Sequence, residues 1–171
     1  MAKINGVNIS LAGEFAVLSQ LALRGYDANM TLGNTKGVDI LVSDPKSEKM
    51  FRLEVKTTRN RSYRSRNYGY VFCSWIMDIK HENITDEKLF YCFVNILEET
   101  GEFKFYIIPS KAVAQYVKDA QELFCKVRER TQKQIKHPMR LFQIGKKGEE
   151  YPINMPLAED YENNWDFKTK N

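Results

Sequence analysis

The first part of the chain changes from one periodic pattern of apolar residues to another. Apolar side chains recur at helical spacing in one early stripe: Leu11, Phe15, Leu18 and Ala22. Ser10 is a suitable N-cap residue, and Gly25 is a suitable stop because glycine readily adopts the conformation that ends helices. We therefore expect a helix over residues 10–24 with this stripe on its buried face.

The runs that follow have the alternating pattern of β-strands. They are residues 26–32, 38–42 and 50–56. The connection 43–49 is rich in turn-forming residues, so the last two runs predict a β-hairpin. A hairpin centred on this connection places Asp39 opposite Glu54, where Cβ atoms are roughly 5 Å apart.

The second half of the chain predicts three more strands and a long helix. The candidate strands are residues 70–76, 89–97 and 103–108. Pro109 ends the last strand, and Ser110 then caps a helix with this apolar stripe: Val113, Val117, Ala120, Phe124 and Val127. The order predicts the α/β class, with one central mixed β-sheet flanked by α-helices. We expect this domain to span residues 1–153 and a polar tail, 154–171, to dock through Trp165.

Composition changes this picture little. The 171 residues, 43% hydrophobic and 28% charged, are typical of one soluble globular domain. Three distant cysteines (Cys73, Cys92 and Cys125) show neither zinc spacing nor a disulfide framework, which favours reduced thiols and a cytoplasmic location. The start of the chain resembles neither a signal peptide nor a membrane segment.

Several other chemistries have no matching motif. The sequence contains no phosphate-binding GxxxxGK[ST] loop and no serine-nucleophile motif. Its two histidines, His81 and His137, lack zinc-site spacing and are most simply surface or turn residues.

The chemistry that the pattern does favour involves acidic residues and a lysine. Glu54 and Lys56 leave the same face of a strand, and Asp39 lies opposite Glu54 in the predicted hairpin. Two carboxylates this close repel each other unless a cation lies between them, and a divalent ion prefers oxygen ligands. Glu14 belongs to the predicted helix, at the edge of its apolar stripe, where an unpaired carboxylate is costly.

Each of these residues also has a simpler interpretation. In this interpretation Glu14 stabilises the helix N-terminus through the helix dipole, which contributes ~0.5 kcal/mol. Asp39 is a common residue at a strand end, and Glu54 with Lys56 can form an ion pair on a solvated face.

A basic and aromatic segment follows directly after Lys56. It contains Arg59, Arg61, Tyr63, Arg64 and Arg66. Arginine binds phosphate through two parallel hydrogen bonds, and aromatic rings stack on bases, so this segment is a candidate nucleic-acid contact. The alternative is a solvated loop. The net charge of +4 fits either interpretation, and a second basic stretch, 126–137, can be the polar end of a helix.

Taken together, four segments resemble the PD-(D/E)xK nuclease superfamily, and in particular its Holliday-junction-resolvase-like members. They are Gly13-Glu14, Gly25-Tyr26, Gly37-Val38-Asp39-Ile40-Leu41-Val42 and Leu53-Glu54-Val55-Lys56-Thr57-Thr58. The resemblance covers residues 8–58 closely and the later elements by their order. Val38 replaces the proline in the family's name.

The resemblance implies a restriction-endonuclease-like fold and metal-dependent hydrolysis of phosphodiester bonds, most simply in DNA. Asp39, Glu54 and the carbonyl of Val55 would bind Mg²⁺ or Mn²⁺. Lys56 would orient the attacking water or stabilise developing charge, and Glu14 would hold a water or a second ion. A homodimer would suit cleavage of both strands of a duplex. The alternative is a non-cleaving module on the same fold that binds nucleic acid or another protein.

Overall fold

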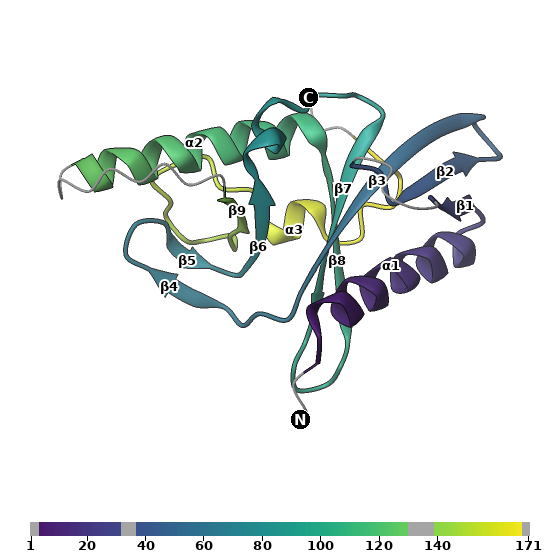
Figure 1. Ribbon diagram of the computed structural model, residues 1–171, viewed down its shortest axis with the longest axis horizontal. Coiled ribbons are helices and arrows are strands. Elements are labelled where there is room, and N and C mark those ends of the chain that lie inside the picture. Colours follow the sequence, from purple (N-terminus) through teal and green to yellow (C-terminus); the bar gives the residue numbers. More distant parts are fainter. Residues whose placement is uncertain (1–3, 32–36, 130–138, 169–171) are drawn as a thin grey trace.

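A computed structural model describes residues 4–31, 37–129 and 139–168 (Figure 1). In chain order its elements are α1 (Gly6–Leu23), β1 (Asp27–Met30), β2 (Ile40–Asp44), β3 (Lys49–Thr58), β4 (Tyr63–Ser65), β5 (Gly69–Val71), β6 (Cys73–Asp78), the 3-10 helix η1 (Ile79–Asn83), β7 (Leu89–Ile96), β8 (Phe103–Pro109), α2 (Ser110–Glu129), β9 (Met139–Ile144) and α3 (Ala158–Tyr161).

The central sheet has the strand order β1-β2-β3-β7-β8. Strands β3 and β7 are parallel, whereas the other neighbours are antiparallel, so the sheet is mixed. The long crossover between β3 and β7 contains the hairpin β4–β5, strand β6 and η1. The expected α/β class, with a central mixed sheet flanked by helices, is confirmed.

The register predicted for the first hairpin is also confirmed. Ile40 pairs with Leu53 and Ser43 with Met50, which is the register that centres the turn between Lys46 and Ser47. Because side chains alternate between the two faces of a strand, this register places Ile40, Val42, Leu53 and Val55 on the opposite face from Glu54 and Lys56.

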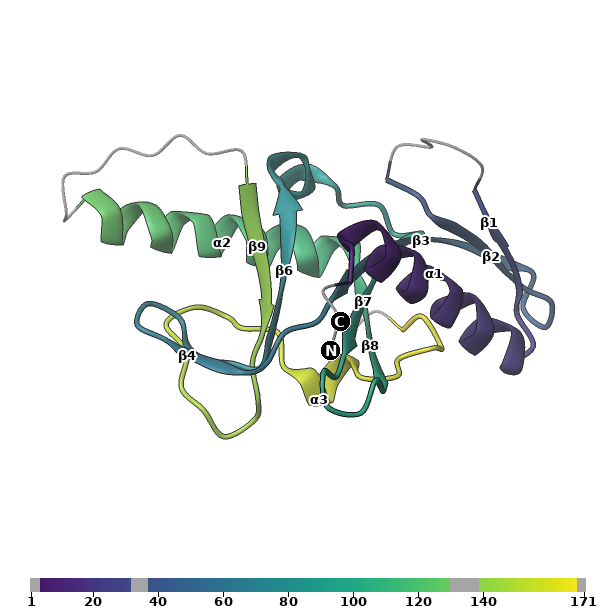
Figure 2. The same ribbon diagram turned by 60° about the horizontal axis from the view of Figure 1, so that its bottom comes forward.

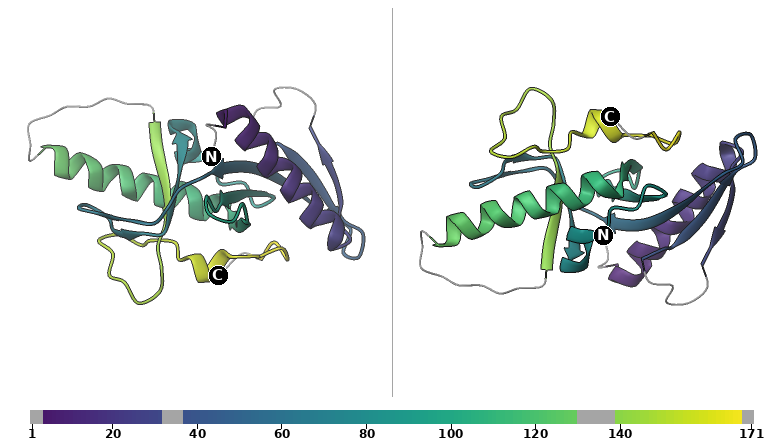
Figure 3. Two further views of the ribbon diagram at one scale, coloured as in Figure 1. Left: turned by 90° about the horizontal axis from the view of Figure 1, so that it is seen from below. Right: turned by 90° about the horizontal axis from the view of Figure 1, so that it is seen from above.

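Apolar clusters cover both faces of the sheet. Figures 1 and 3 show α1 and α2 on opposite sides of it. On the α1 side the cluster includes Val17, Leu21, Leu53, Cys92, Ile107, Trp165 and Phe167. On the α2 side it includes Trp75, Tyr91, Phe93, Tyr106, Val117 and Phe142. The tail therefore docks on the α1 side, with Trp165 only 4% exposed.

The start and the orientation of α1 differ from the prediction. The helix begins at Gly6, because the Oδ1 atom of Asn5, not Ser10, caps it by accepting the N–H of Val7 at 3.0 Å. The buried face contains Gly13, Val17 and Leu21. Most of the predicted stripe faces outward instead: Leu11 is 42% and Phe15 56% exposed, whereas Leu18 is half-buried against the core. Figure 2 shows α1 lying along the outside of the sheet.

Glycine explains this orientation of α1. A Cβ atom at Gly13 would lie 1.9 Å from Oγ1 of Thr57, so only glycine lets the helix approach β3 this closely. By length and composition alone, with a mean hydropathy of 1.3, α1 could also cross a membrane, although no membrane segment was expected at the start of the chain. In this structure it packs on the sheet.

The later elements follow the prediction with shifted boundaries. The run expected as one strand over 70–76 is divided between β5 and β6. β7, β8 and α2 form where they were expected, and Val113, Val117 and Ala120 are buried. Most of the second basic stretch, including His137, lies outside the described residues.

Candidate active site

Asp39 lies directly before the first residue of β2, at the end of the sheet. Its backbone N–H donates to the carbonyl of Leu53 at 2.8 Å, and its Oδ2 accepts the N–H of Val55 at 2.7 Å. β3 continues beyond Leu53, the last residue that it pairs with β2. There the side chain of Asp39 accepts the backbone N–H that a neighbouring strand would otherwise bind. These two bonds lie on either side of Glu54 and fix Asp39 beside it.

Glu54 is a buried carboxylate with one oxygen paired and one free. Its Oε1 lies 2.6 Å from Nζ of Lys56, and the residue is only 2% exposed. Its Oε2 has no hydrogen-bond partner within the described ranges. A Cβ atom at Gly37 would lie 3.3 Å from this oxygen, so the missing side chain, at a φ of +74°, leaves space in front of it.

His81 contacts the carboxylate of Glu54, and Tyr91 in turn contacts His81. Nε2 of His81 lies 3.6 Å from Oε1 of Glu54, and Nδ1 lies 2.7 Å from the hydroxyl of Tyr91. Burial lowers the pKa of His81, which favours a neutral ring. Burial is the main cause that raises the pKa of Tyr91, and the nearby carboxylate of Glu54 raises it further, so the tyrosine hydroxyl contacts both His81 and the surroundings of Glu54.

The interpretation of His81 as a surface or turn residue is therefore wrong, since it is 2% exposed. No local motif around His81 indicates this role. Tyr91 is the parallel partner of Glu54 in the β3–β7 pair, and that pairing follows from the strand order, which the sequence does not specify.

Glu14 reaches the same cluster from α1. Burial is the main cause that raises its pKa, and the carboxylate of Asp39 raises it further, whereas Lys56 lowers it. Burial also raises the pKa of Asp39, and outweighs the N–H of Val55 and the ammonium of Lys56, which lower it. Glu14, Asp39, Glu54 and Lys56 thus influence one another electrostatically, and Lys80 also lowers the pKa of Asp39.

This cluster fits a divalent ion that needs few protein ligands. Oε2 of Glu54, which has no hydrogen-bond partner among the described residues, and the adjacent Asp39 provide two carboxylates side by side. No group of three or more His, Cys, Asp or Glu side chains is arranged to hold an ion in the described part of the chain. Mg²⁺ commonly takes one or two carboxylates and completes its shell with water and substrate phosphate.

The arginine segment forms the hairpin β4–β5 and its approach. Figure 1 shows this hairpin extending from the end of β3 on the side away from α1. It is fixed at both ends: Gln143 donates to the hydroxyl of Tyr63 at its base at 2.9 Å, and Tyr68 in its turn donates to the carbonyl of Ala120 at 3.0 Å.

The arginine side chains of this segment lie largely at the surface. Arg61 pairs with Glu98 at 3.3 Å, and Arg64 pairs with Glu149 at 3.3 Å. Both arginine side chains are 70% exposed, so these pairs are weak and a phosphate can replace the carboxylates. Arg66 is exposed and Arg59 is half-buried.

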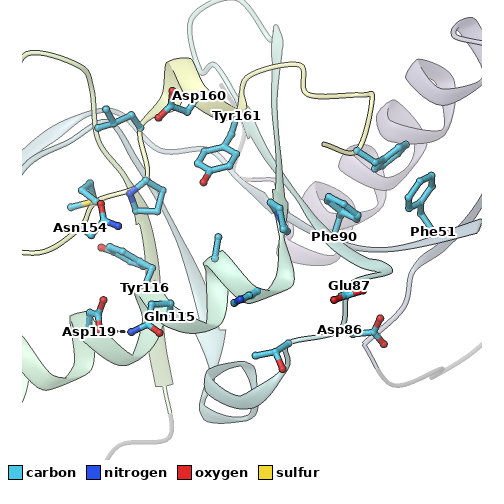
Figure 4. A pocket seen from close by; sticks show the side chains of 18 residues that line it. Phe51, Asp86, Glu87, Phe90, Gln115, Tyr116, Asp119, Asn154, Asp160 and Tyr161 are labelled. Carbon is cyan, nitrogen blue, oxygen red and sulfur yellow. Dashed lines mark hydrogen bonds between the residues drawn. The ribbon is translucent and has the colours of Figure 1, made fainter. Parts of the chain in front are cut away.

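A separate groove of about 1010 Å³ lies between the start of α2 and the C-terminal segment (Figure 4). Its acidic lining residues are Asp86, Glu87, Asp119 and Asp160, with Lys111 as the basic one. Asp86 forms an ion pair with Arg52. None of the residues of the Glu54 cluster lines this groove, and its charge disfavours a phosphate backbone.

Comparisons with known proteins give a likeness of fold. No protein-family model matches the chain, and no curated protein matches it significantly in sequence. The structure is similar to that of a bacterial homing endonuclease, I-Ssp6803I, with a TM-score of 0.50 and 14% sequence identity. The match covers 95% of this chain and 92% of that one. The α/β fold of this chain therefore also occurs in a homing endonuclease.

Proposed function

We propose that this chain is a divalent-metal-dependent nuclease that hydrolyses phosphodiester bonds in DNA. The observation that carries the proposal is the arrangement around Glu54. One oxygen of this buried carboxylate contacts Lys56, and the other has no hydrogen-bond partner among the residues that the structure describes. Asp39 is fixed beside it by the N–H of Val55. A fold that also occurs in a homing endonuclease supports a nuclease at the coarse level.

Asp39 and Glu54, with the carbonyl of Val55, would hold Mg²⁺ or Mn²⁺. The chemistry that such an ion supplies is Lewis-acid polarisation of the scissile phosphate. The protein's own contribution is to keep both carboxylates in place before substrate arrives. His81 and Tyr91 hold Glu54 from one side, and the N–H of Val55 holds Asp39 from the other.

Lys56 has the position required to stabilise negative charge at the reacting phosphate. Its side chain is 29% exposed, whereas that of Glu54 is 3% exposed, so the ammonium lies on the solvent side of the pair. Substrate would approach from that side and share the ammonium with Glu54. Burial raises the pKa of Glu14, so this residue can accept or share a proton of a bound water more readily than an ordinary glutamate.

The substrate would be a nucleic acid because of the segment that follows Lys56. Arg59, Arg61, Arg64, Arg66 and Tyr63 lie on it, and exposed guanidinium groups can exchange their carboxylate partners for phosphates. Binding through phosphates depends strongly on salt and carries no sequence preference by itself.

The experiment that tests this function measures cleavage of supercoiled, linear, single-stranded and branched DNA, and of RNA, with Mg²⁺, Mn²⁺ or EDTA. We expect at least one DNA form to be cut only with metal. Lys56→Met should slow cleavage by at least about 100-fold and leave the fold intact. Binding of DNA by the wild type without cleavage in either metal would overturn the enzyme and favour the non-cleaving module.

A further inference from the structure

The 3-10 helix η1 lies beside the candidate active site. Figures 2 and 3 show this turn, which follows β6, between β9 and the start of α1. His81 fixes η1 on one side, because its ring is 2% exposed and its Nε2 lies 3.6 Å from Oε1 of Glu54. Glu82 fixes it on the other side through an ion pair with Arg140 of β9. The residues of η1 therefore keep a defined position next to Glu54.

Lys80 is the residue of η1 that precedes His81, and its ammonium group acts on the carboxylates of the site. Burial is the largest influence on the pKa of Asp39 and raises it, whereas the positive charge of Lys80 lowers it. Charges influence each other appreciably only over short distances, because water and salt screen them. Lys80 therefore lies close to Asp39, although the two residues belong to different elements.

The ammonium group of Lys80 is available to a ligand, unlike that of Lys56. Lys56 lies 2.6 Å from Oε1 of Glu54. Lys80 is exposed, and Oδ1 of Asp78 holds only its backbone N–H, at 2.9 Å. Its ammonium forms no ion pair with any residue of the ranges that the structure describes. An anion can therefore bind Lys80 without displacing a carboxylate.

The charges of the site require a further cation when a phosphate arrives. Glu14, Asp39 and Glu54 carry three carboxylates, which Lys56 and the divalent ion proposed above would balance. A phosphodiester then adds a negative charge, and the charge on its oxygens grows as the reaction proceeds. The ammonium of Lys80 offsets this charge. Lysine suits such a contact because it binds phosphate as a point charge on a long stem.

We propose that Lys80 is a second phosphate-binding residue of this site, which contacts a backbone phosphate of the DNA strand at the reaction centre. Lys80 acts from η1, whereas Lys56 acts from β3. This inference rests on the proposed function, and it adds a substrate contact that belongs neither to the acidic cluster nor to the arginine segment.

The first test measures binding of the DNA form that the wild type prefers, in EDTA and at several salt concentrations, so it does not depend on cleavage. Lys80→Met should make the slope of log K against log salt less negative by about one, because one phosphate contact is lost. Lys88→Met is the matched control and should keep the slope of the wild type. Lys88 is also exposed, and its backbone N–H also binds the aspartate two residues before it, at 2.8 Å.

The second test measures kcat/KM for cleavage in Mg²⁺. Lys80→Met should lower it at least about tenfold, whereas Lys80→Arg, which keeps the charge, and Lys88→Met should stay within about threefold of the wild type. All variants should unfold at the urea midpoint of the wild type, because both lysines are exposed.

The outcomes separate this inference from the proposed function. A wild type that cuts DNA, with Lys80→Met and Lys88→Met indistinguishable in both tests, overturns the role of Lys80 alone. Equal losses in Lys80→Met and Lys80→Arg also overturn it, because the charge is then not what matters. A wild type that binds DNA without cutting it overturns the nuclease, while a smaller slope in Lys80→Met alone still supports the phosphate contact. A wild type that neither binds nor cuts DNA overturns both.

Discussion

At the scale of single residues, the sequence indicates the residues of the candidate site but not the residues that hold them in place. Asp39, Glu54 and Lys56 are recognisable because a strand period and a turn place them together. His81 and Tyr91 cannot be recognised in this way. Tyr91 lies beside Glu54 only because β7 pairs in parallel with β3. A partner supplied by a crossover connection leaves no local pattern in the sequence.

Tyr91→Phe tests the support of Glu54. The change removes one hydroxyl and leaves Nδ1 of the buried His81 without its 2.7 Å partner, while the ring can keep its stacking on Phe93. We expect the free energy of unfolding to fall by about 1–3 kcal/mol, measured by urea denaturation, together with slower cleavage. An unchanged stability and rate would mean that the tyrosine hydroxyl does not hold the histidine.

At the scale of elements, α1 shows where periodicity is insufficient. Its apolar residues occur on more than one face, so a stripe such as Leu11–Phe15–Leu18–Ala22 cannot reveal which face is buried. The close approach at Gly13 decides it, since Val17 and Leu21 then face the sheet. The hairpin was predictable because its turn fixes the register, and a register fixes every side chain on two strands.

Gly13→Ala tests this account of α1. The added methyl group would collide with Thr57, so the helix must shift away from β3 and take Glu14 with it. We expect a loss of about 1–3 kcal/mol in the free energy of unfolding, measured by urea denaturation. Gly6→Ala is the matched control, because nothing lies within 4 Å of a Cβ atom there. Equal stabilities of the two variants would contradict the packing described.

At the scale of the whole molecule, the two faces of the sheet are closed by segments distant in sequence. The sequence gives the strands and the α/β class, but the insertion of β7 beside β3 follows only from the complete packing. The tail shows the same limit: Trp165 is an evident candidate for docking, whereas its partners come from the residues just after α1 and from β8. Arg24 lies 4.7 Å from its ring, Tyr26 donates to its carbonyl, and Phe105 contacts its indole.

Trp165→Ala tests whether the tail belongs to the folded unit. The change removes a buried ring between α1 and β8 and should lower the free energy of unfolding by about 3–5 kcal/mol in urea. The neighbouring Asp166→Ala, at a side chain that is 68% exposed, should change it by less than about 0.5 kcal/mol. Similar effects of both variants would show that the tail adds no core packing.

The central claim is that Asp39 and Glu54 form the reaction centre of a nuclease. Its most direct test compares the rates at which wild type, Asp39→Asn and Asp44→Asn cleave the preferred DNA substrate in Mg²⁺. Asp44 is the matched control, because it lies at the other end of the same hairpin, where it binds Ser47. We expect Asp39→Asn to slow cleavage by at least about 100-fold and Asp44→Asn to stay within about threefold of the wild type. Equal rates for all three proteins would contradict this assignment of the site.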